Sequence, residues 1–276
     1  MSGDIWFALL LTLLAGLSTG IGSGLAYFIR EPKPRFMTLI LGFSAGVMLY
    51  VSFAELLHIS FDQIGYLISN IAFFIGIAFI GLIDMLVPHE YKQEHASDAA
   101  LSLNKDNTGL NGHGHHGFRH GAPKYRNLKR AGMLTAIGIA IHNFPEGLAV
   151  FSSGITGDQA FGILVAVAIA LHNIPEGISV SMPIFEATGN RRQAFLYSFS
   201  AGLAEPIGAI IGYTILFNFL TPTVIYALLA FAAGIMVYIS LDELLPTAHQ
   251  YGEEHLVIIG VVAGMLIMAL SIFLLT

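Results

Sequence analysis

The chain has 276 residues, of which 55% are hydrophobic and only 11% are charged, and its formal net charge is −6. An average soluble domain carries about 25% charged residues, so this composition excludes an ordinary water-soluble fold and favours a lipid solvent. Cysteine is absent, which excludes disulfides and thiolate metal sites. Any metal must therefore be bound by histidine, asparagine, carboxylate or backbone oxygen.

Eight apolar segments are long enough to cross a bilayer, which requires about 20 mostly apolar residues. They are 5–29, 36–57, 66–87, 131–154, 159–182, 193–218, 223–245 and 256–275. The first segment follows Asp4 and no basic residue, and it is longer than the roughly 7–15 apolar residues of a signal peptide, so we expect it to be retained. The sequence predicts an all-α polytopic membrane protein with a single eight-span domain, 1–276.

The basic residues of the chain all lie in connections on one face of the predicted membrane domain. The positive-inside rule assigns this face to the cytoplasm. Eight spans then place both termini outside, and we expect a multi-pass protein of the inner (plasma) membrane. The twelve residues are Arg30, Lys33, Arg35, Lys92, Lys105, Arg119, Lys124, Arg126, Lys129, Arg130, Arg191 and Arg192.

Two internal repeats are visible in the sequence. Residues 41–60 match 229–248 at an offset of 188, with identity at ten of the twenty positions, and residues 136–150 match 166–180 at an offset of 30. In the predicted topology both pairs run in opposite directions through the membrane. Such inverted repeats are typical of secondary transporters, whose binding sites lie near the midplane at the repeat interface.

The second repeat carries a doubled motif, HNFPEG at 142–147 and HNIPEG at 172–177. His142 and His172 lie 11 and 13 residues into their spans. At about 1.5 Å per residue this depth is the middle of a hydrocarbon core about 30 Å thick. Residues four apart share a helix face, so His142 with Glu146, and His172 with Glu176, are predicted to face a common point.

Three more polar residues belong to this predicted site. Asn143 and Asn173 lie one step around their helices and would face a second, neighbouring position, and the two-oxygen carboxylates of the motif can serve both positions. Glu205 adds a carboxylate at similar depth in the sixth span. We expect Pro145 and Pro175 to free carbonyls and kink their helices, and Gly147 and Gly177 to leave room for a passing ion.

The types of ligand narrow the choice of metal ion. A carboxylate at the membrane midplane costs about 2.5–3.5 kcal/mol, which a divalent cation or protonation would offset. Imidazole, carboxylate and amide together suit zinc, iron(II) and manganese, whereas copper(I) prefers sulfur and calcium or magnesium prefer oxygen alone. A proton relay without metal, an intramembrane metallohydrolase and a metal efflux transporter are the alternatives. The hydrolase needs an open coordination position, and the sequence contains no HExxH motif.

The doubled motif resembles that of the ZIP family of metal transporters. With AGLAEPIGAIIG in span six and SLDELLP in span seven, the chain is most similar to the bacterial ZupT-type branch. The resemblance covers almost the whole chain and implies an inverted 3+2+3 arrangement, a binuclear centre and metal uptake into the cytoplasm. It implies one position made of His142, Glu146, His172 and Glu176, and another made of Asn143, Glu146, Asn173, Glu176 and Glu205. It also implies a broad range of cargo, with cobalt, nickel and cadmium as further candidates.

Polar residues outside the motif are candidates for the approach and exit of metal. Glu55, His58 and Asp62 are predicted at the outer end of span two, and Asp84, His89, Asp242, Glu243 and His249 at the cytoplasmic end. The connection at about 88–130 is polar, Gly-rich and expected to be disordered. Its histidines, which also include His95, His113, His115, His116 and His120, suit weak metal binding. We expect the bilayer and divalent metals as partners, no cofactor, no nucleic acid and no enzymatic activity, and we leave open a homodimer.

Overall fold

The computed structural model describes residues 2–28, 33–86, 123–155, 159–216, 221–251 and 254–275. Within these ranges all regular elements are helical, which confirms the all-α class. Three short π-helical turns, labelled η, interrupt the α-helices. The elements are α1 (Ser2–Phe28), α2 (Pro34–Val51), η1 (Ser52–Leu56), α3 (Leu57–Leu86), α5 (Pro123–Gly154), α6 (Gln159–Thr188), α7 (Arg191–Gly202), α8 (Ala204–Ile211), η2 (Gly212–Leu216), α9 (Pro222–Ile239), η3 (Ser240–Leu244), α10 (Leu245–His249) and α11 (Glu254–Leu275).

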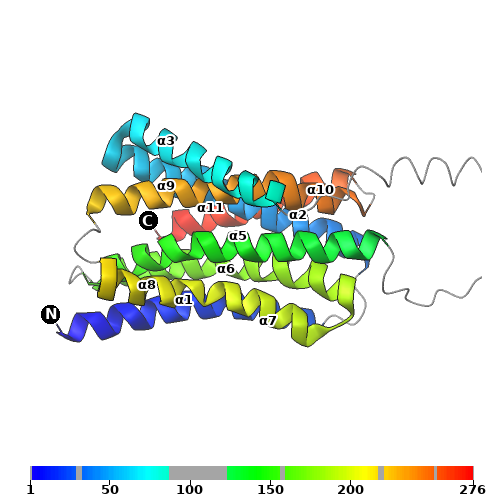
Figure 1. Ribbon diagram of the computed structural model, residues 1–276, viewed down its shortest axis with the longest axis horizontal. Helices are drawn as coiled ribbons and strands as arrows, with labels where there is room; N and C mark the ends of the chain where they lie inside the picture. Colours follow the sequence, from blue (N-terminus) through cyan, green and yellow to red (C-terminus); the bar gives the residue numbers. More distant parts are fainter. Residues whose placement is uncertain are drawn as a thin grey trace, which may run out of the picture.

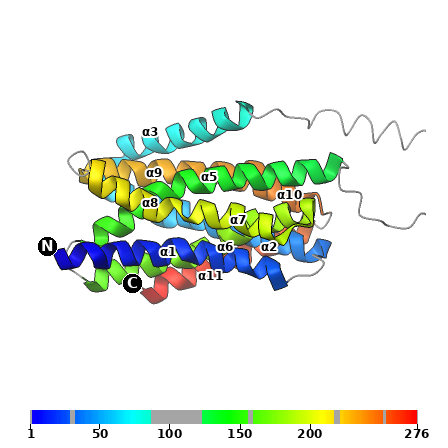
Figure 2. The same ribbon diagram turned by 60° about the horizontal axis from the view of Figure 1, so that its bottom comes forward.

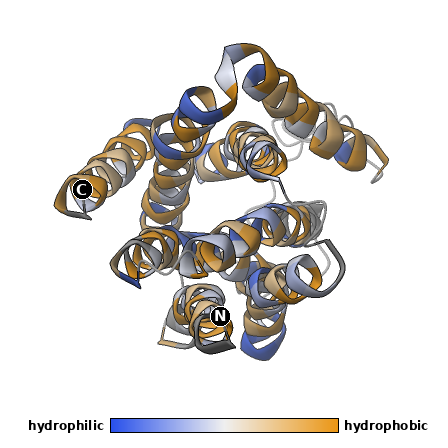
Figure 3. Cartoon of the chain, turned by 90° about the vertical axis from the view of Figure 1, so that its left-hand side faces the viewer, coloured by the Kyte–Doolittle hydropathy of each residue, from blue (hydrophilic) through white to orange (hydrophobic). Residues whose placement is uncertain are grey.

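The helices lie side by side along the long axis of the molecule, and both chain termini are at the same end (Figure 1). A second view, turned by 60°, shows the same side-by-side alignment of the helices (Figure 2). Viewed along the bundle, hydrophobic residues follow the helices around its periphery (Figure 3). Large apolar side chains such as Trp6, Leu266 and Phe273 are exposed on this outer surface, as expected where lipid is the solvent.

Seven helical stretches in the described ranges are long and apolar enough to cross a membrane. One of them, Pro34–Leu86, is 53 residues long and contains a break at Gly65, whose φ of 78° is left-handed. The predicted span 193–218 is not one regular helix, because it breaks at Leu203 between α7 and α8. Pro206, which follows closely, has no N–H to donate to the carbonyl of Gly202, and this weakens the helix at that turn.

The first sequence repeat reappears in the helix boundaries. Helix α2 and helix α9 begin and end at positions 188 apart, and so do the π-turns η1 and η3 that follow them. Helix α3 packs along α9, and α11 packs along α2. In Figure 1, α2 runs from right to left and α9 from left to right. The matched pair is therefore antiparallel in the bundle.

The glycines of the doubled motif are packing positions, which corrects the expectation that they leave room for an ion. A methyl group at Gly147 would lie 2.1 Å from the carbonyl oxygen of Glu205 on α8, and one at Gly177 would lie 2.1 Å from that of Thr19 on α1. Only hydrogen fits at either position, so helices α8 and α1 pack directly against the motif backbone. Helices α5 and α6 continue through Pro145 and Pro175.

Candidate metal site

The motif helices α5 and α6 bring their histidines and glutamates together in the interior of the bundle. The Nε2 atom of His142 lies 3.0 Å from Oε1 of Glu176, and Nε2 of His172 lies 3.4 Å from Oε1 of Glu146. Each histidine therefore faces the glutamate of the other motif. All four side chains are at most 1% exposed, so water does not screen the charges that they carry.

The two asparagines are held by neighbouring helices in matching ways. The amide nitrogen of Asn143 donates to the carbonyl of Ala201 on α7 at 3.2 Å, and that of Asn173 donates to the carbonyl of Ala15 on α1 at 3.0 Å. Asn173 also donates to Oε1 of Glu205 at 2.5 Å. Both amide nitrogens therefore donate to neighbouring groups, and each Oδ1 atom is left buried without a partner.

Buried ligand atoms without a hydrogen-bond partner are concentrated at this site. Each such atom normally lowers folding stability by about 1–3 kcal/mol. A cluster of them in one place therefore indicates a site for a bound partner. A cation at the centre could be this partner, because imidazole nitrogens and carboxylate or amide oxygens are atom types that bind divalent metals. Among the described residues they are Nδ1 of His142, Oδ1 of Asn143, both oxygens of Glu146, both ring nitrogens of His172, Oδ1 of Asn173, Oε2 of Glu176 and Oε2 of Glu205.

The remaining buried atoms without a partner in the described ranges are Oε2 of Glu55 and Oγ1 of Thr19. Glu55 was expected at the outer end of its span, as a candidate for the approach of metal. The structure places it in η1, where its carboxylate interacts electrostatically with His172 and Glu146. The residue is partly exposed, although its Oε2 atom is shielded and has no hydrogen-bond partner. Its nearness to the site could not be read from the sequence.

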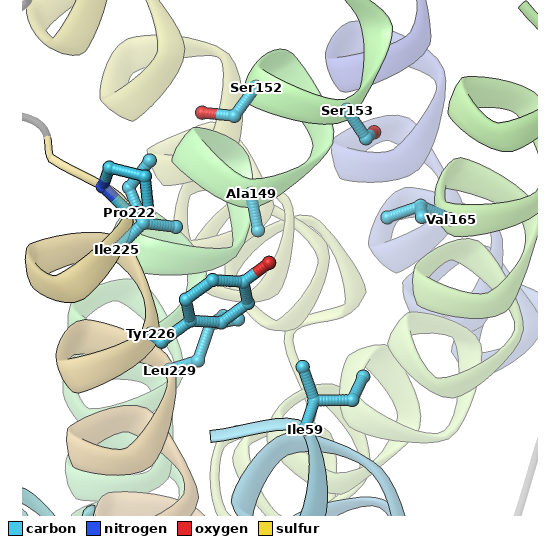
Figure 4. A pocket seen from close by; sticks show the side chains of 9 residues that line it. All are labelled: Ile59, Ala149, Ser152, Ser153, Val165, Pro222, Ile225, Tyr226 and Leu229. Carbon is cyan, nitrogen blue, oxygen red and sulfur yellow. The ribbon is translucent and has the colours of Figure 1, made fainter. Parts of the chain in front are cut away.

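A cavity of about 320 Å³ lies between α3, α5, α6 and α9, toward the end of the bundle that carries the chain termini. Figure 4 shows its lining, which is mainly apolar with the hydroxyl groups of Ser152, Ser153 and Tyr226. Ile59 in this lining is one helical turn beyond Glu55, and Ala149 is one turn beyond Glu146. The inner end of the cavity is therefore close to the carboxylates of the site.

A second acidic group lies toward the other end of the bundle. Asp84, Asp242 and Glu243 each offer a carboxylate oxygen within 4.8 Å of the others, and the hydroxyl of Tyr238 donates to Asp84 at 3.2 Å. The sequence predicted these three residues together at the end of the bundle expected to be cytoplasmic. His89 and the other histidines of the long connection lie outside the described residues. His249 is exposed, with Nδ1 2.7 Å from the carbonyl oxygen of Leu245.

At the end that the sequence predicts to be outside, His58 and Asp62 form an exposed pair with 3.7 Å between Nε2 and Oδ2. Such exposed pairs contribute little to stability. Both residues lie in α3, three and seven positions after Glu55. Their side chains are exposed, whereas Oε2 of Glu55 is shielded. Of the three residues expected at this end, only Glu55 therefore has a shielded carboxylate oxygen.

Comparison with known proteins identifies the family of this chain. A family model described as ZIP zinc transporter matches residues 87–272. The chain belongs to the ZIP family. ZIP relatives named zinc transporter ZupT match almost end to end. The protein from Nitratidesulfovibrio vulgaris is 51% identical over 99% of this chain and 98% of its own length. Those from Chlorobium phaeovibrioides and Clostridium perfringens are 52% and 50% identical, over 99% and 98% of this chain and 99% and 96% of their own lengths.

The family assignment decides between classes of function. ZIP proteins are transporters and not enzymes, so a multi-pass membrane transporter is the class to which this chain belongs. The intramembrane metallohydrolase, which the sequence alone left open, loses its support.

Proposed function

We propose that this protein takes up zinc and similar divalent cations into the cytoplasm through a site at the middle of the membrane. The observation that carries the proposal is the cluster of buried, unpartnered nitrogen and oxygen atoms on α5, α6 and α8. Zinc as cargo is favoured by the ZupT relatives, which are named zinc transporters. Uptake, and not efflux, is favoured by the same relationship.

The proposed topology has eight spans in an inverted 3+2+3 arrangement. A straight helix of 53 residues would be about 80 Å long, far more than a hydrocarbon core of about 30 Å, so Pro34–Leu86 must count as two spans. The positive φ of Gly65 lies where the chain reverses. Matched boundaries at an offset of 188 relate the first and last groups of helices, and α5 and α6 form the central pair. Both termini are then outside the cell.

We further propose two neighbouring metal positions. His142, Glu146, His172 and Glu176 form the first, and Asn143, Glu146, Asn173, Glu176 and Glu205 form the second, which contains no imidazole. Because iron(II) and manganese accept oxygen-rich sites more readily than zinc does, the second position favours a broad range of cargo.

The proposed outer approach runs through the cavity shown in Figure 4 to Glu55. Glu55 lies one helical turn from the cavity lining and interacts with His172 and Glu146 of the site. A cation leaving the cavity would meet Glu55 before the doubled motif. On the cytoplasmic side, Asp84, Asp242 and Glu243 would receive the released ion.

Purified protein in liposomes of known orientation provides the test. Radioactive zinc, iron(II) and manganese are supplied outside the vesicles, with an imposed proton gradient as a second condition. Zinc accumulation in wild-type vesicles, and none in empty vesicles, is the expected result. Proton flux without metal movement would indicate a proton relay, and metal movement only in the opposite orientation would indicate efflux. Either outcome would overturn the proposal.

A further inference from the structure

Helix α1 and the helices α7–α8 occupy equivalent places on the two sides of the motif pair. The carbonyl of Ala15 accepts a hydrogen bond from Asn173, and the carbonyl of Ala201, at an offset of 186, accepts one from Asn143. A methyl group at Gly16 would lie 2.6 Å from the carbonyl oxygen of Gly202, and one at Gly202 would lie 2.6 Å from that of Gly16. Each helix therefore meets the motif in the same way.

The same correspondence pairs Thr19 with Glu205. The backbone of Glu205 packs on Gly147 of the first motif, and the backbone of Thr19 packs on Gly177 of the second. In both cases the carbonyl oxygen would lie 2.1 Å from a methyl carbon added to the glycine. Each residue is four positions after the alanine that holds a motif asparagine. Where one side of the site offers a carboxylate, the other therefore offers a hydroxyl group.

The hydroxyl of Thr19 has no partner although the residue is fully buried. Threonine in a helix usually donates to the carbonyl four residues earlier, as Thr12 does to Ala8 at 2.8 Å. For Thr19 that carbonyl belongs to Ala15, which already accepts from Ser18 at 2.6 Å and from Asn173 at 3.0 Å. A methyl group at Gly202 would lie 3.0 Å from Oγ1 of Thr19, so the hydroxyl lies against α7 beside Gly202, the residue that follows the Ala201 anchor of Asn143.

We propose that Thr19 is the counterpart of Glu205 at the second metal position and determines which metals that position prefers. This inference rests on the proposed function and adds a ligand to its site. The hydroxyl oxygen contacts the cation, or a water bound to it, as a neutral oxygen donor. The second position thus has one carboxylate fewer than a symmetric site would have, and its neutral oxygens favour manganese and iron(II) relative to zinc.

The test uses wild-type protein purified in detergent, with Thr19→Val as the variant that removes the hydroxyl and keeps the shape. Thr19→Ala is a second hydroxyl-free variant in case valine perturbs folding, and Thr19→Ser retains the hydroxyl. Thr12→Val is the matched control, because Thr12 is a buried threonine of the same helix whose hydroxyl is satisfied within it. Dissociation constants for manganese and zinc are measured by calorimetry, and uptake of both metals is measured in vesicles.

We expect Thr19→Val and Thr19→Ala to weaken manganese binding about three- to tenfold, as loss of one hydrogen-bond-strength contact predicts. Zinc binding should change less than about twofold because His142 and His172 remain, and Thr19→Ser and Thr12→Val should behave as wild type. Unchanged manganese binding in the hydroxyl-free variants, or equal losses in Thr12→Val, would overturn the inference. If wild-type vesicles transport no metal, the proposed function fails, while the binding comparison still decides the role of Thr19.

Discussion

His142 on α5 and Glu176 on α6 approach to 3.0 Å across the boundary between the two motifs. The two residues are 34 positions apart in the chain, and the pair is completely buried. His172 and Glu146 repeat the relationship with the roles of the helices exchanged. Neither helix could form the site alone, because each histidine has its acidic neighbour on the other helix.

Because each histidine faces the glutamate of the other motif, the two motif glutamates are the central residues of the proposed site. Glu146→Ala or Glu176→Ala removes a carboxylate that both proposed positions share, and leaves a buried histidine without its neighbour. We expect uptake of zinc, iron(II) and manganese to fall to the background of empty vesicles. Glu254→Ala is the control, since Glu254 is an exposed residue in the first turn of α11 and its loss should leave uptake unchanged. Retention of substantial uptake of any metal by Glu146→Ala would show that the two positions do not share this residue.

The asparagines and Glu205 are assigned to the second position only. Asn143→Ala, Asn173→Ala and Glu205→Ala should therefore lower manganese and iron(II) uptake more than zinc uptake, about tenfold against about threefold, because zinc can still use the histidines. The measurement is competition uptake at matched membrane expression. Equal depression of the three metals by Glu205→Ala would mean that Glu205 contributes to both positions.

The motif glycines are predicted to be required for close helix packing, and hence for stability, and not to widen a passage. Gly147→Ala and Gly177→Ala force a methyl group to within 2.1 Å of a backbone oxygen, and overpacking of this kind typically costs about 1–3 kcal/mol. We expect a lower thermal unfolding midpoint for both variants in detergent. Gly24→Ala is the matched control on α1, since nothing lies within 4 Å of the added carbon. Midpoints for Gly147→Ala and Gly177→Ala equal to that of Gly24→Ala would contradict the close packing.

The eight-span topology can be tested with single cysteines, because the chain has none. Thr223 and Arg192 are both accessible at opposite ends of the bundle. In intact cells, Thr223→Cys should react with a membrane-impermeant maleimide, and Arg192→Cys should react only after the membrane is permeabilised. Ser102→Cys, in the long connection outside the described residues, should behave like Arg192→Cys. Labelling of Arg192→Cys or Ser102→Cys in intact cells would show that the orientation is the reverse of the proposed one.

The sequence by itself predicted the helical class, the lipid solvent and the candidate metal ligands, and the structure confirms the first of these. Its composition excludes a soluble domain, and the spacing of His142 and Glu146, repeated by His172 and Glu176, places both pairs on helix faces whatever the surrounding fold. The repeat at an offset of 188 is matched by the shared boundaries of α2 and α9, down to their first residues Pro34 and Pro222. These properties are local, so a single chain is enough to reveal them.

Only the tertiary structure decided which groups on different helices meet. Glu55 lies in η1 with one carboxylate oxygen shielded and without a hydrogen-bond partner, and no periodicity in the sequence distinguishes it from its exposed neighbours His58 and Asp62. Thr19 corresponds to Glu205 through backbone contacts, although the two side chains share no chemistry that a sequence repeat would detect. Gly147 and Gly177 became packing positions because α8 and α1 approach them. Contacts between helices depend on how each backbone is placed against the next, and residue spacing within one helix carries no information about that placement.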